Sequence, residues 1–401
     1  MQSLTARRLI FCFVLVLFCL QLTACANLDR SPQKAADFAA DATALTGNWP
    51  MEGYGPGRGR MTIEDIQAPL ALQNEYTVVG DAQFASPVAI ADGLLFAESD
   101  KQLHALALQD GKERWSFDIP GSFLSPAITK DAVFVRAEVG SEGFLFALTP
   151  STGAKLWQYK FAAVGSSFDN VGGHVTSPVV VDGLVLVGAS RSFHALDAKT
   201  GEEKWRFDAQ DPLASSAAVA GDTVYITDFK QLFALDLHTG QERWHFAHET
   251  VTLLFAPIVA GERVVITSAD MIYALDRNSG NLLWQRQSVK GVALVPAAAT
   301  DTEIYVKSVD QMMAFRLSDG EPLWQYSATN FVSLPAVTSE YAYIVTRADG
   351  GSQLRALQRA DGKEVWRVDN NRLSNAAPVA TGGRIYVRTV DGHVLAYKPQ
   401  Q

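Results

Sequence analysis

Histidine side chains are the first candidates for metal chemistry in this sequence. His104 and His194 each stand directly before an alanine in two copies of one repeated motif, LHALALQDGKERW and FHALDAKTGEEKW. Neutral imidazole is a common metal ligand. The other copies have Phe, Tyr, Met, Arg or Leu at this position, so the position accepts bulk, and packing is favoured over metal ligation. His245 is expected at the surface, and it need not form a site with His248.

Cysteine is the next residue type with chemistry of its own. Two of the three cysteines lie in an apolar run, LIFCFVLVLFCL, that follows a pair of arginines. The run is short for a membrane span and ends at LTAC, so residues 1–24 resemble a bacterial lipoprotein signal peptide and Cys25 the acylated residue. The alternative is an uncleaved anchor with an incidental cysteine. Because cleavage leaves only Cys25, the sequence predicts no disulfide, no thiol nucleophile and no cysteine metal site.

A glycine-rich stretch, GYGPGRGR at residues 53–60, invites comparison with phosphate-binding loops. It lacks the Gly-Lys-Ser/Thr ending, and no strand is expected before it, so a flexible or turn-rich lead-in is favoured. Residues 25–69 have few large apolar side chains, and we interpret them as a tether and lead-in.

The chain has a formal net charge of −9 and no basic runs, which argues against nucleic acid as a partner.

One motif recurs seven times, and the elements that it forms must position the histidines His104 and His194. Each copy has an alanine ten residues and a glycine four residues before a tryptophan, at Trp115, Trp157, Trp205, Trp244, Trp284, Trp324 and Trp366. Such constancy indicates one structural unit repeated. The glycine follows Asp, Thr or Ser, which is typical of a hairpin turn. Two more short apolar runs precede each hairpin, so each unit is predicted to be a four-stranded antiparallel meander.

Four-stranded units of about 40 residues are typical of propeller blades around an axis. Eight blade starts are marked by Pro87, Pro126, Pro178, Ala217, Pro257, Pro296, Pro335 and Pro378. The eighth hairpin reaches Ala396 without a tryptophan, while Tyr76 precedes the first start by eleven residues, the spacing also found after Trp115. We therefore predict an all-β, eight-bladed β-propeller over residues 70–401, whose last blade is closed by a strand within residues 70–80.

The tryptophan motif, best kept in FHALDAKTGEEKW and LFALDLHTGQERW, resembles the PQQ-like propeller repeat over about 330 residues. This repeat serves quinoprotein dehydrogenases as well as non-enzymatic scaffolds. Eight blades behind a lipobox are similar to the BamB family of outer-membrane assembly lipoproteins. The family's Leu-Arg-Gly stretch is replaced by AQDPLASSAAV at residues 209–219, and its Asp-Val-Asp motif is not found, so no binding residue is transferred.

The resemblance implies a non-catalytic, lipid-anchored scaffold on the periplasmic face of the outer membrane. Ala26, next to the acylated residue, also favours the outer membrane. The expected partner is the outer-membrane β-barrel assembly machinery, and no cofactor is expected. One alternative is a PQQ-binding oxidoreductase, which would need calcium-binding side chains, a catalytic aspartate and, in many members, adjacent cysteines. The other is a binding module for a soluble ligand or polysaccharide.

The connections before several blades have large apolar residues, as in FLSP at 123–126, VTLLFAP at 251–257 and NFVSLP at 330–335. At one end of a propeller they would form an apolar rim suited to a protein partner. The alternative is that they plug the narrow end of the central channel. The candidate partner-binding residues are Phe123, Leu124, Leu253, Leu254, Phe255 and Phe331.

Overall fold

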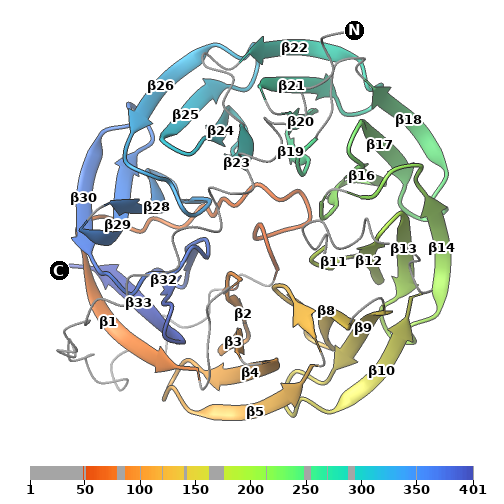
Figure 1. The fold of residues 1–401 in the computed structure, drawn as a ribbon, viewed down its shortest axis with the longest axis horizontal. Coiled ribbons are helices and arrows are strands. Elements are labelled where there is room, and N and C mark those ends of the chain that lie inside the picture. The colour runs from red at the N-terminus through yellow and green to blue at the C-terminus, as the bar shows by residue number, and fades with distance from the viewer. Residues whose placement is uncertain are drawn as a thin grey trace, which may run out of the picture. The chain divides into compact units, whose positions relative to one another are not determined.

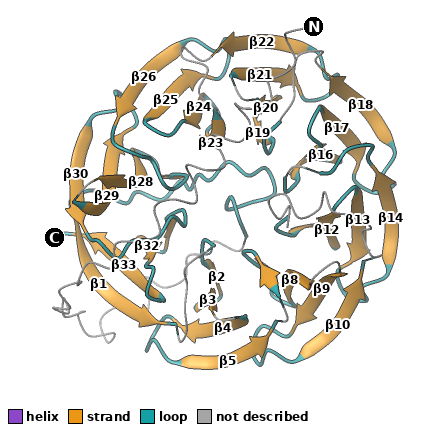
Figure 2. Cartoon of the chain, viewed as in Figure 1, coloured by secondary structure: helices purple, strands orange, loops and turns teal. Residues whose placement is uncertain are grey.

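The computed structural model describes residues 48, 51–78, 86–99, 101–119, 121–139, 142–161, 176–213, 215–247, 254–268, 270–287, 294–348 and 350–400, all within the compact unit of residues 36–401. The regular elements of these residues are β-strands, paired antiparallel into eight sheets around a common centre (Figures 1 and 2). The predicted eight-bladed β-propeller is therefore confirmed. Across the described ranges there is no helix that could span a membrane.

The first four blades follow the chain in order. Blade 1 contains β2 (Ala89–Ala91), β3 (Leu94–Ser99), β4 (Gln102–Ala107) and β5 (Glu113–Asp118). Blade 2 contains β6 (Ser122–Phe123), β7 (Ala127–Ile128), β8 (Val133–Val139), β9 (Glu142–Leu148) and β10 (Lys155–Lys160), and both β6 and β7 pair with β8. Blade 3 contains β11 (Val179–Val181), β12 (Leu184–Ala189), β13 (Ser192–Asp197) and β14 (Glu203–Asp208). Blade 4 contains β15 (Ala218–Ala220), β16 (Thr223–Thr227), β17 (Gln231–Asp236) and β18 (Glu242–Ala247).

The last four blades complete the ring. Blade 5 contains β19 (Ile258–Ala260), β20 (Arg263–Thr267), β21 (Met271–Asp276) and β22 (Leu282–Gln287). Blade 6 contains β23 (Val295–Ala299), β24 (Glu303–Lys307), β25 (Gln311–Arg316) and β26 (Pro322–Ser327). Blade 7 contains β27 (Ala336–Val337), β28 (Tyr341–Ala348), β29 (Gly351–Gln358) and β30 (Glu364–Asp369). Blade 8 contains β31 (Val379–Thr381), β32 (Arg384–Arg388), β33 (His393–Pro399) and β1 (Leu70–Thr77).

Both ends of the propeller sequence meet in blade 8, as predicted. β1 pairs antiparallel with β33, so the first strand of the chain is the outer strand of the last blade (Figure 1). The register differs from the sequence-based expectation in one respect. Asn74 stands opposite Ala396, the pairing that Trp115 makes with Ala105 in blade 1, and Tyr76 lies two residues further along β1.

The motif glycine and the motif tryptophan meet across the interface between consecutive blades. Gly201 has a φ of +74°, and a Cβ added to it would lie 2.7 Å from Trp157 Cε3 of the preceding blade. The same contact joins Gly153 to Trp115, Gly240 to Trp205, Gly280 to Trp244, Gly320 to Trp284 and Gly362 to Trp324. The glycine therefore serves the turn through its positive φ, and it also leaves space for the neighbouring indole.

The motif tryptophans also link the blades by hydrogen bonds. The indole N–H of Trp205 donates to the backbone oxygen of Leu237 in the next blade, at 2.8 Å. Equivalent bonds come from Trp115, Trp157, Trp284 and Trp324. The motif alanines are 0% exposed in all eight blades, at positions 105, 147, 195, 234, 274, 314, 356 and 396. A small buried residue on the third strand and a large aromatic on the fourth thus pack each blade against its neighbour.

Candidate functional site

The centre of the ring holds residues 51–66, which we call the axial segment (Figure 1). The inner strands of blades 4 to 7 each donate one backbone N–H to it at 2.9–3.0 Å: Val219 to Pro56, Val259 to Gly57, Ala299 to Gly59 and Val337 to Arg60. Met51 lies in the hydrophobic cluster that joins blades 2, 3 and 4. These bonds use N–H groups on the inner edge of the sheets, which would otherwise need another acceptor.

Hydrogen bonds near both ends of the axial segment also connect the chain to blades 1 and 8. Before the segment, Asn48 Oδ1 accepts the backbone N–H of Asp92 in the β2–β3 turn of blade 1, at 3.0 Å. Near its end, the Glu64 carboxylate accepts the N–H groups of Gly382 and Gly383 in the β31–β32 turn of blade 8, at 3.0 and 2.7 Å. Residues 48 and 51–64 are therefore hydrogen-bonded to blade 1 and to blades 4 to 8, while Met51 lies in the cluster shared by blades 2 to 4.

This arrangement corrects the interpretation of residues 25–69 as a tether for the part from residue 51 onward. A Cβ on Gly59 would lie 3.1 Å from Ala299 O, and one on Gly57 would lie 3.5 Å from Val259 O. Gly59 therefore lets the backbone lie close against the inner strand of blade 6, whereas a Cβ on Gly57 would make an ordinary van der Waals contact. In the sequence, the alternation of glycine with proline and arginine was the one sign of this close contact. It was not decisive, because a mobile loop has the same composition.

Three charged side chains of the axial segment are brought together at the centre. Arg58 Nη2 lies 3.5 Å from Glu52 Oε1, and these side chains are 10% and 20% exposed. Arg60 is 3% exposed. Burial raises the pKa of Glu52, but Arg58 and Arg60 more than offset this effect and hold the pKa below its ordinary value. Burial lowers the pKa of Arg60 to about 10, although the Glu52 carboxylate opposes the shift.

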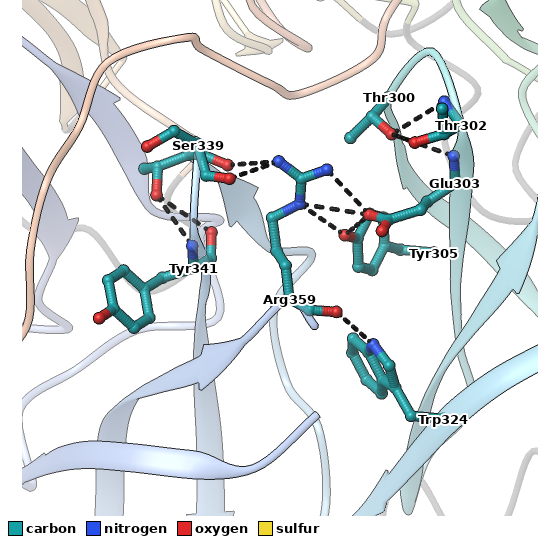
Figure 3. A network of polar contacts seen from close by, with 9 residues as sticks. Thr300, Thr302, Glu303, Tyr305, Trp324, Ser339, Tyr341 and Arg359 are labelled. Atoms are coloured by element: carbon teal, nitrogen blue, oxygen red, sulfur yellow. Dashed lines mark hydrogen bonds and ion pairs between the residues drawn. The ribbon is translucent and has the colours of Figure 1, made fainter. Parts of the chain in front are cut away.

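A second polar network, centred on Arg359, ties blade 6 to blade 7 beside the axial segment (Figure 3). Arg359 Nη2 lies 3.0 Å from Glu303 Oε2, its Nε donates to Tyr305 Oη at 3.0 Å, and its Nη1 donates to Ser339 O at 2.6 Å. The indole of Trp324 donates to the backbone oxygen of Arg359 at 2.6 Å. The guanidinium is engaged on every side by the protein itself, so this network is a clamp between blades.

The two motif histidines are buried in the third strands of their blades, each beside one glutamate. His104 Nδ1 is 2.7 Å from Glu113 Oε2, and both His104 and His194 are 2% exposed. His194 lies between Glu203, at 2.7 Å, and Ser192 Oγ, at 2.8 Å, an order that resembles a nucleophile–base–acid chain. Its burial keeps substrates away from the imidazole, so we assign it a packing role. Elsewhere in the described ranges, too, no three His, Cys, Asp or Glu side chains are grouped to hold a metal ion.

The candidate partner-binding residues are spread over three blade connections on different sides of the ring, which Figure 1 shows at β5–β8, β18–β19 and β26–β28. Phe123 lies in β6 with its backbone opposite Ala137. Leu124 and Phe255 are half-buried. Leu253 and the proposed lipidation residue Cys25 lie outside the described residues.

Leu254 and Phe331 face the core instead of a partner. They are 1% and 2% exposed. Phe331 packs edge-on against Tyr326 with ring centroids 6.2 Å apart, and Leu254 lies in a cluster with Tyr225. This corrects the expectation of an exposed apolar rim at these two positions, because their connections fold back onto the blades and bury the side chains.

Comparison with curated proteins shows two kinds of relative. BamB of Yersinia pestis is 30% identical over 140 residues, covering 32% of this chain and 35% of that protein. The quinohemoprotein alcohol dehydrogenase of Comamonas testosteroni is 31% identical over 200 residues, covering 43% of this chain and 27% of that protein. The chain spans between 15% and 35% of the length of the curated relatives it matches.

Solved structures of the same two kinds share the fold. BamB from Moraxella catarrhalis matches with a TM-score of 0.64 at 19% identity, covering 82% of this chain and 100% of that one. The Comamonas testosteroni quinohemoprotein alcohol dehydrogenase matches with a TM-score of 0.68 at 16% identity, covering 90% and 83%. At such identities the likeness concerns the fold alone.

A family model settles the relationship over most of the propeller. The model described as outer membrane protein assembly factor BamB matches residues 73–193, 189–331 and 314–401. Together these matches include all eight blades except the first residues of β1. The chain therefore belongs to the outer membrane protein assembly factor BamB family of β-propellers.

Proposed function

We propose that this protein is a non-catalytic scaffold that takes part in the assembly of outer-membrane β-barrel proteins. Membership of the BamB family supports this role, and the lipoprotein-like sequence of residues 1–25 supports a lipid anchor on Cys25 at the periplasmic face of the outer membrane. The closed ring offers a rigid surface on which a partner can be held near the membrane.

The observation that favours a scaffold over a quinone enzyme is the axial segment. In a ring of blades, the central channel is where a planar cofactor can be enclosed on all sides. Here the channel holds residues 51–66, which are bonded to the inner strands of blades 4 to 7 and clamped to blade 8 through Glu64. The residues present therefore do not fit PQQ at the centre of the ring, and we derive no reaction through it.

The surface proposed for a partner is the loop face, the end of the ring with the connections into each first strand and the turns between second and third strands. Leu124 and Phe255 are half-buried there. Two apolar residues that sequence reasoning missed lie in turns of the same face: Val309 is 61% and Val390 37% exposed. They belong to the β24–β25 and β32–β33 turns, and no periodic signal distinguishes them from other turn residues.

Deletion of the gene in its host tests the assembly role. The expected result is a smaller amount of folded outer-membrane β-barrels, measured by heat-modifiable migration on gels. Expression of the wild-type chain should restore that amount, and Cys25→Ser, which cannot be acylated, should restore less. Barrel folding that is unchanged by the deletion would contradict the proposal.

Titration of the purified protein with PQQ and Ca²⁺ tests the enzyme alternative separately. We expect neither saturable cofactor binding by absorbance nor calcium-dependent dye reduction. A stoichiometric complex would show that the axial segment leaves the channel and would return the enzyme alternative to first place.

A further inference from the structure

The centre of the propeller contains buried hydrogen-bond donors without acceptors. Arg58 Nε, Arg58 Nη1 and Arg60 Nη1 are inaccessible to solvent and meet no acceptor among the described residues. Within the described ranges, the one carboxylate in ion-pair contact with either arginine is that of Glu52, 3.5 Å from Arg58 Nη2. Buried donors are nearly always satisfied in folded proteins, because leaving one unpaired costs the free energy of its lost hydration. These three nitrogens therefore indicate an additional acceptor at this place.

The charge of the cluster shows what kind of acceptor is needed. Of the residues that the structure describes, the cluster contains two guanidinium groups, of Arg58 and Arg60, and the carboxylate of Glu52, which leaves one positive charge. The pKa of Arg60, lowered by burial to about 10, still keeps its side chain protonated at neutral pH. A buried charge without a counter-charge is strongly unfavourable. Water can satisfy the donors, but it cannot neutralise the charge.

We propose that the propeller binds a small anion of single charge at its centre, held by Arg58 and Arg60. Backbone hydrogen bonds fix the site, because Gly57, Gly59 and Arg60 are bonded to three consecutive inner strands. Glu52 sets the charge of the ligand: a second negative charge would be repelled by its carboxylate. The recognising chemistry is guanidinium N–H donation to a halide or to a small carboxylate.

Thermal unfolding of the purified full chain tests the site in solution. At constant ionic strength, chloride or acetate replaces gluconate, a much larger anion that serves as the reference. We expect a saturable rise in the melting temperature, because a ligand that binds only the folded state stabilises it. If chloride raises the melting temperature at a lower concentration than acetate does, the site prefers a halide. The reverse order identifies a carboxylate site.

Variants of the cluster separate binding from general salt effects. Arg60→Met should abolish the saturable rise, and Glu52→Gln should lower the half-effective concentration several-fold, because it removes the competing carboxylate. Arg367→Met is the matched control, since Arg367 is 56% exposed and pairs with Glu364 in β30, the outer strand of blade 7. It should respond as the wild type does. A wild-type melting temperature equally insensitive to all three anions, or an unchanged response in Arg60→Met, would overturn the proposal.

A crystal grown in bromide gives a test that does not depend on variant folding. The expected result is an anomalous peak within hydrogen-bond reach of Arg58 and Arg60. Ordered water alone beside the two guanidinium groups would overturn the proposal.

Discussion

Tyr76, in the strand that closes the ring, donates its hydroxyl to the backbone oxygen of Leu108 in blade 1, with 3.1 Å between the two oxygens. Leu108 lies three residues after the motif alanine, which is the position where the tryptophans of other blades donate. The closing blade thus makes the same link with another side chain, although Asn74 occupies the register of the tryptophan. Tyr76 is 1% exposed, so the link is buried.

Tyr76→Phe should lower the free energy of unfolding by about 1 kcal/mol, because it removes the hydroxyl and leaves the oxygen of Leu108 without this donor. Tyr76→Ala should cost about 3 kcal/mol or more, since it also empties the space of the ring. Denaturant unfolding of the full chain measures both values. A Tyr76→Phe variant as stable as the wild type would show that the bond does not contribute to closure.

Gly201→Ala should destabilise the protein more than Gly183→Ala. Both glycines have a φ of +74°, but a Cβ meets Trp157 at 2.7 Å at position 201 and finds open space at position 183. Backbone strain alone costs about 1 kcal/mol, and the clash should add about 1 to 3 kcal/mol at position 201. Unfolding free energies of the two variants give the difference directly. Equal losses would mean that the turn alone requires the glycine.

Arg359→Met should loosen the contact between blades 6 and 7. Arg359 and Glu303 are each 17% exposed, so removal of the guanidinium leaves a mostly buried carboxylate and should cost about 2 kcal/mol or more. The matched control is Arg316→Met, whose pair with Asp319 is about half exposed and should contribute less than about 1 kcal/mol. Thermal or denaturant unfolding distinguishes the two. A loss at Arg316 as large as that at Arg359 would contradict the assignment of the clamp.

His194 should make the stability depend on pH. Burial lowers its pKa, and the Glu203 carboxylate offsets the shift only in part. The folded chain therefore binds fewer protons than the unfolded chain, whose histidine pKa is about 6.5, so this group favours folding above that pH. The contribution is lost as the pH falls from about 6.5 through the lower folded pKa.

The variant His194→Phe isolates this effect, because other blades have phenylalanine at the same repeat position. Relative to this variant, the wild type should lose unfolding free energy as the pH falls from about 7.5 to about 5. His245→Phe, which replaces a half-exposed imidazole, serves as the control. Parallel pH curves for wild type and His194→Phe would rule out a titrating role for His194.

The sequence was most informative where one contact recurs in every blade. The spacing of alanine, glycine and tryptophan predicted the blades, because each repeat packs only against its neighbours. The residues at the blade starts predicted the number of blades, and the interval from Tyr76 to Pro87 predicted the closure by β1. The meeting of Gly201 with Trp157 was not predicted, since it joins two different copies of the motif. The register of Tyr76 also escaped prediction, because Asn74, which stands opposite Ala396, precedes Pro87 by thirteen residues, two more than separate Trp115 from Pro126. Counting back eleven residues from Pro87 therefore reaches Tyr76 instead of Asn74.

The site was less predictable than the fold. The axial segment is held by backbone groups of distant strands, and glycines that permit close contact have the same sequence signature as glycines in a mobile loop. Leu254 and Phe331 were expected on a rim, but an apolar residue in a connection gives no sign of whether that connection folds back onto the core. The cluster of Glu52, Arg58 and Arg60 could not be predicted either, because it forms only when the axial segment is bound by these distant strands.

Site-specific photocrosslinking in the host tests the scaffold role most directly. Photoreactive residues at Phe255, Val309 and Val390 place the probe on the loop face, and one at Lys363, in the β29–β30 turn at the opposite end of the ring, is the control. The account predicts that a component of the β-barrel assembly machinery is trapped from at least one loop-face position and not from Lys363. Absence of every such component from all three loop-face positions, in variants that reach the outer membrane at wild-type levels, would contradict it.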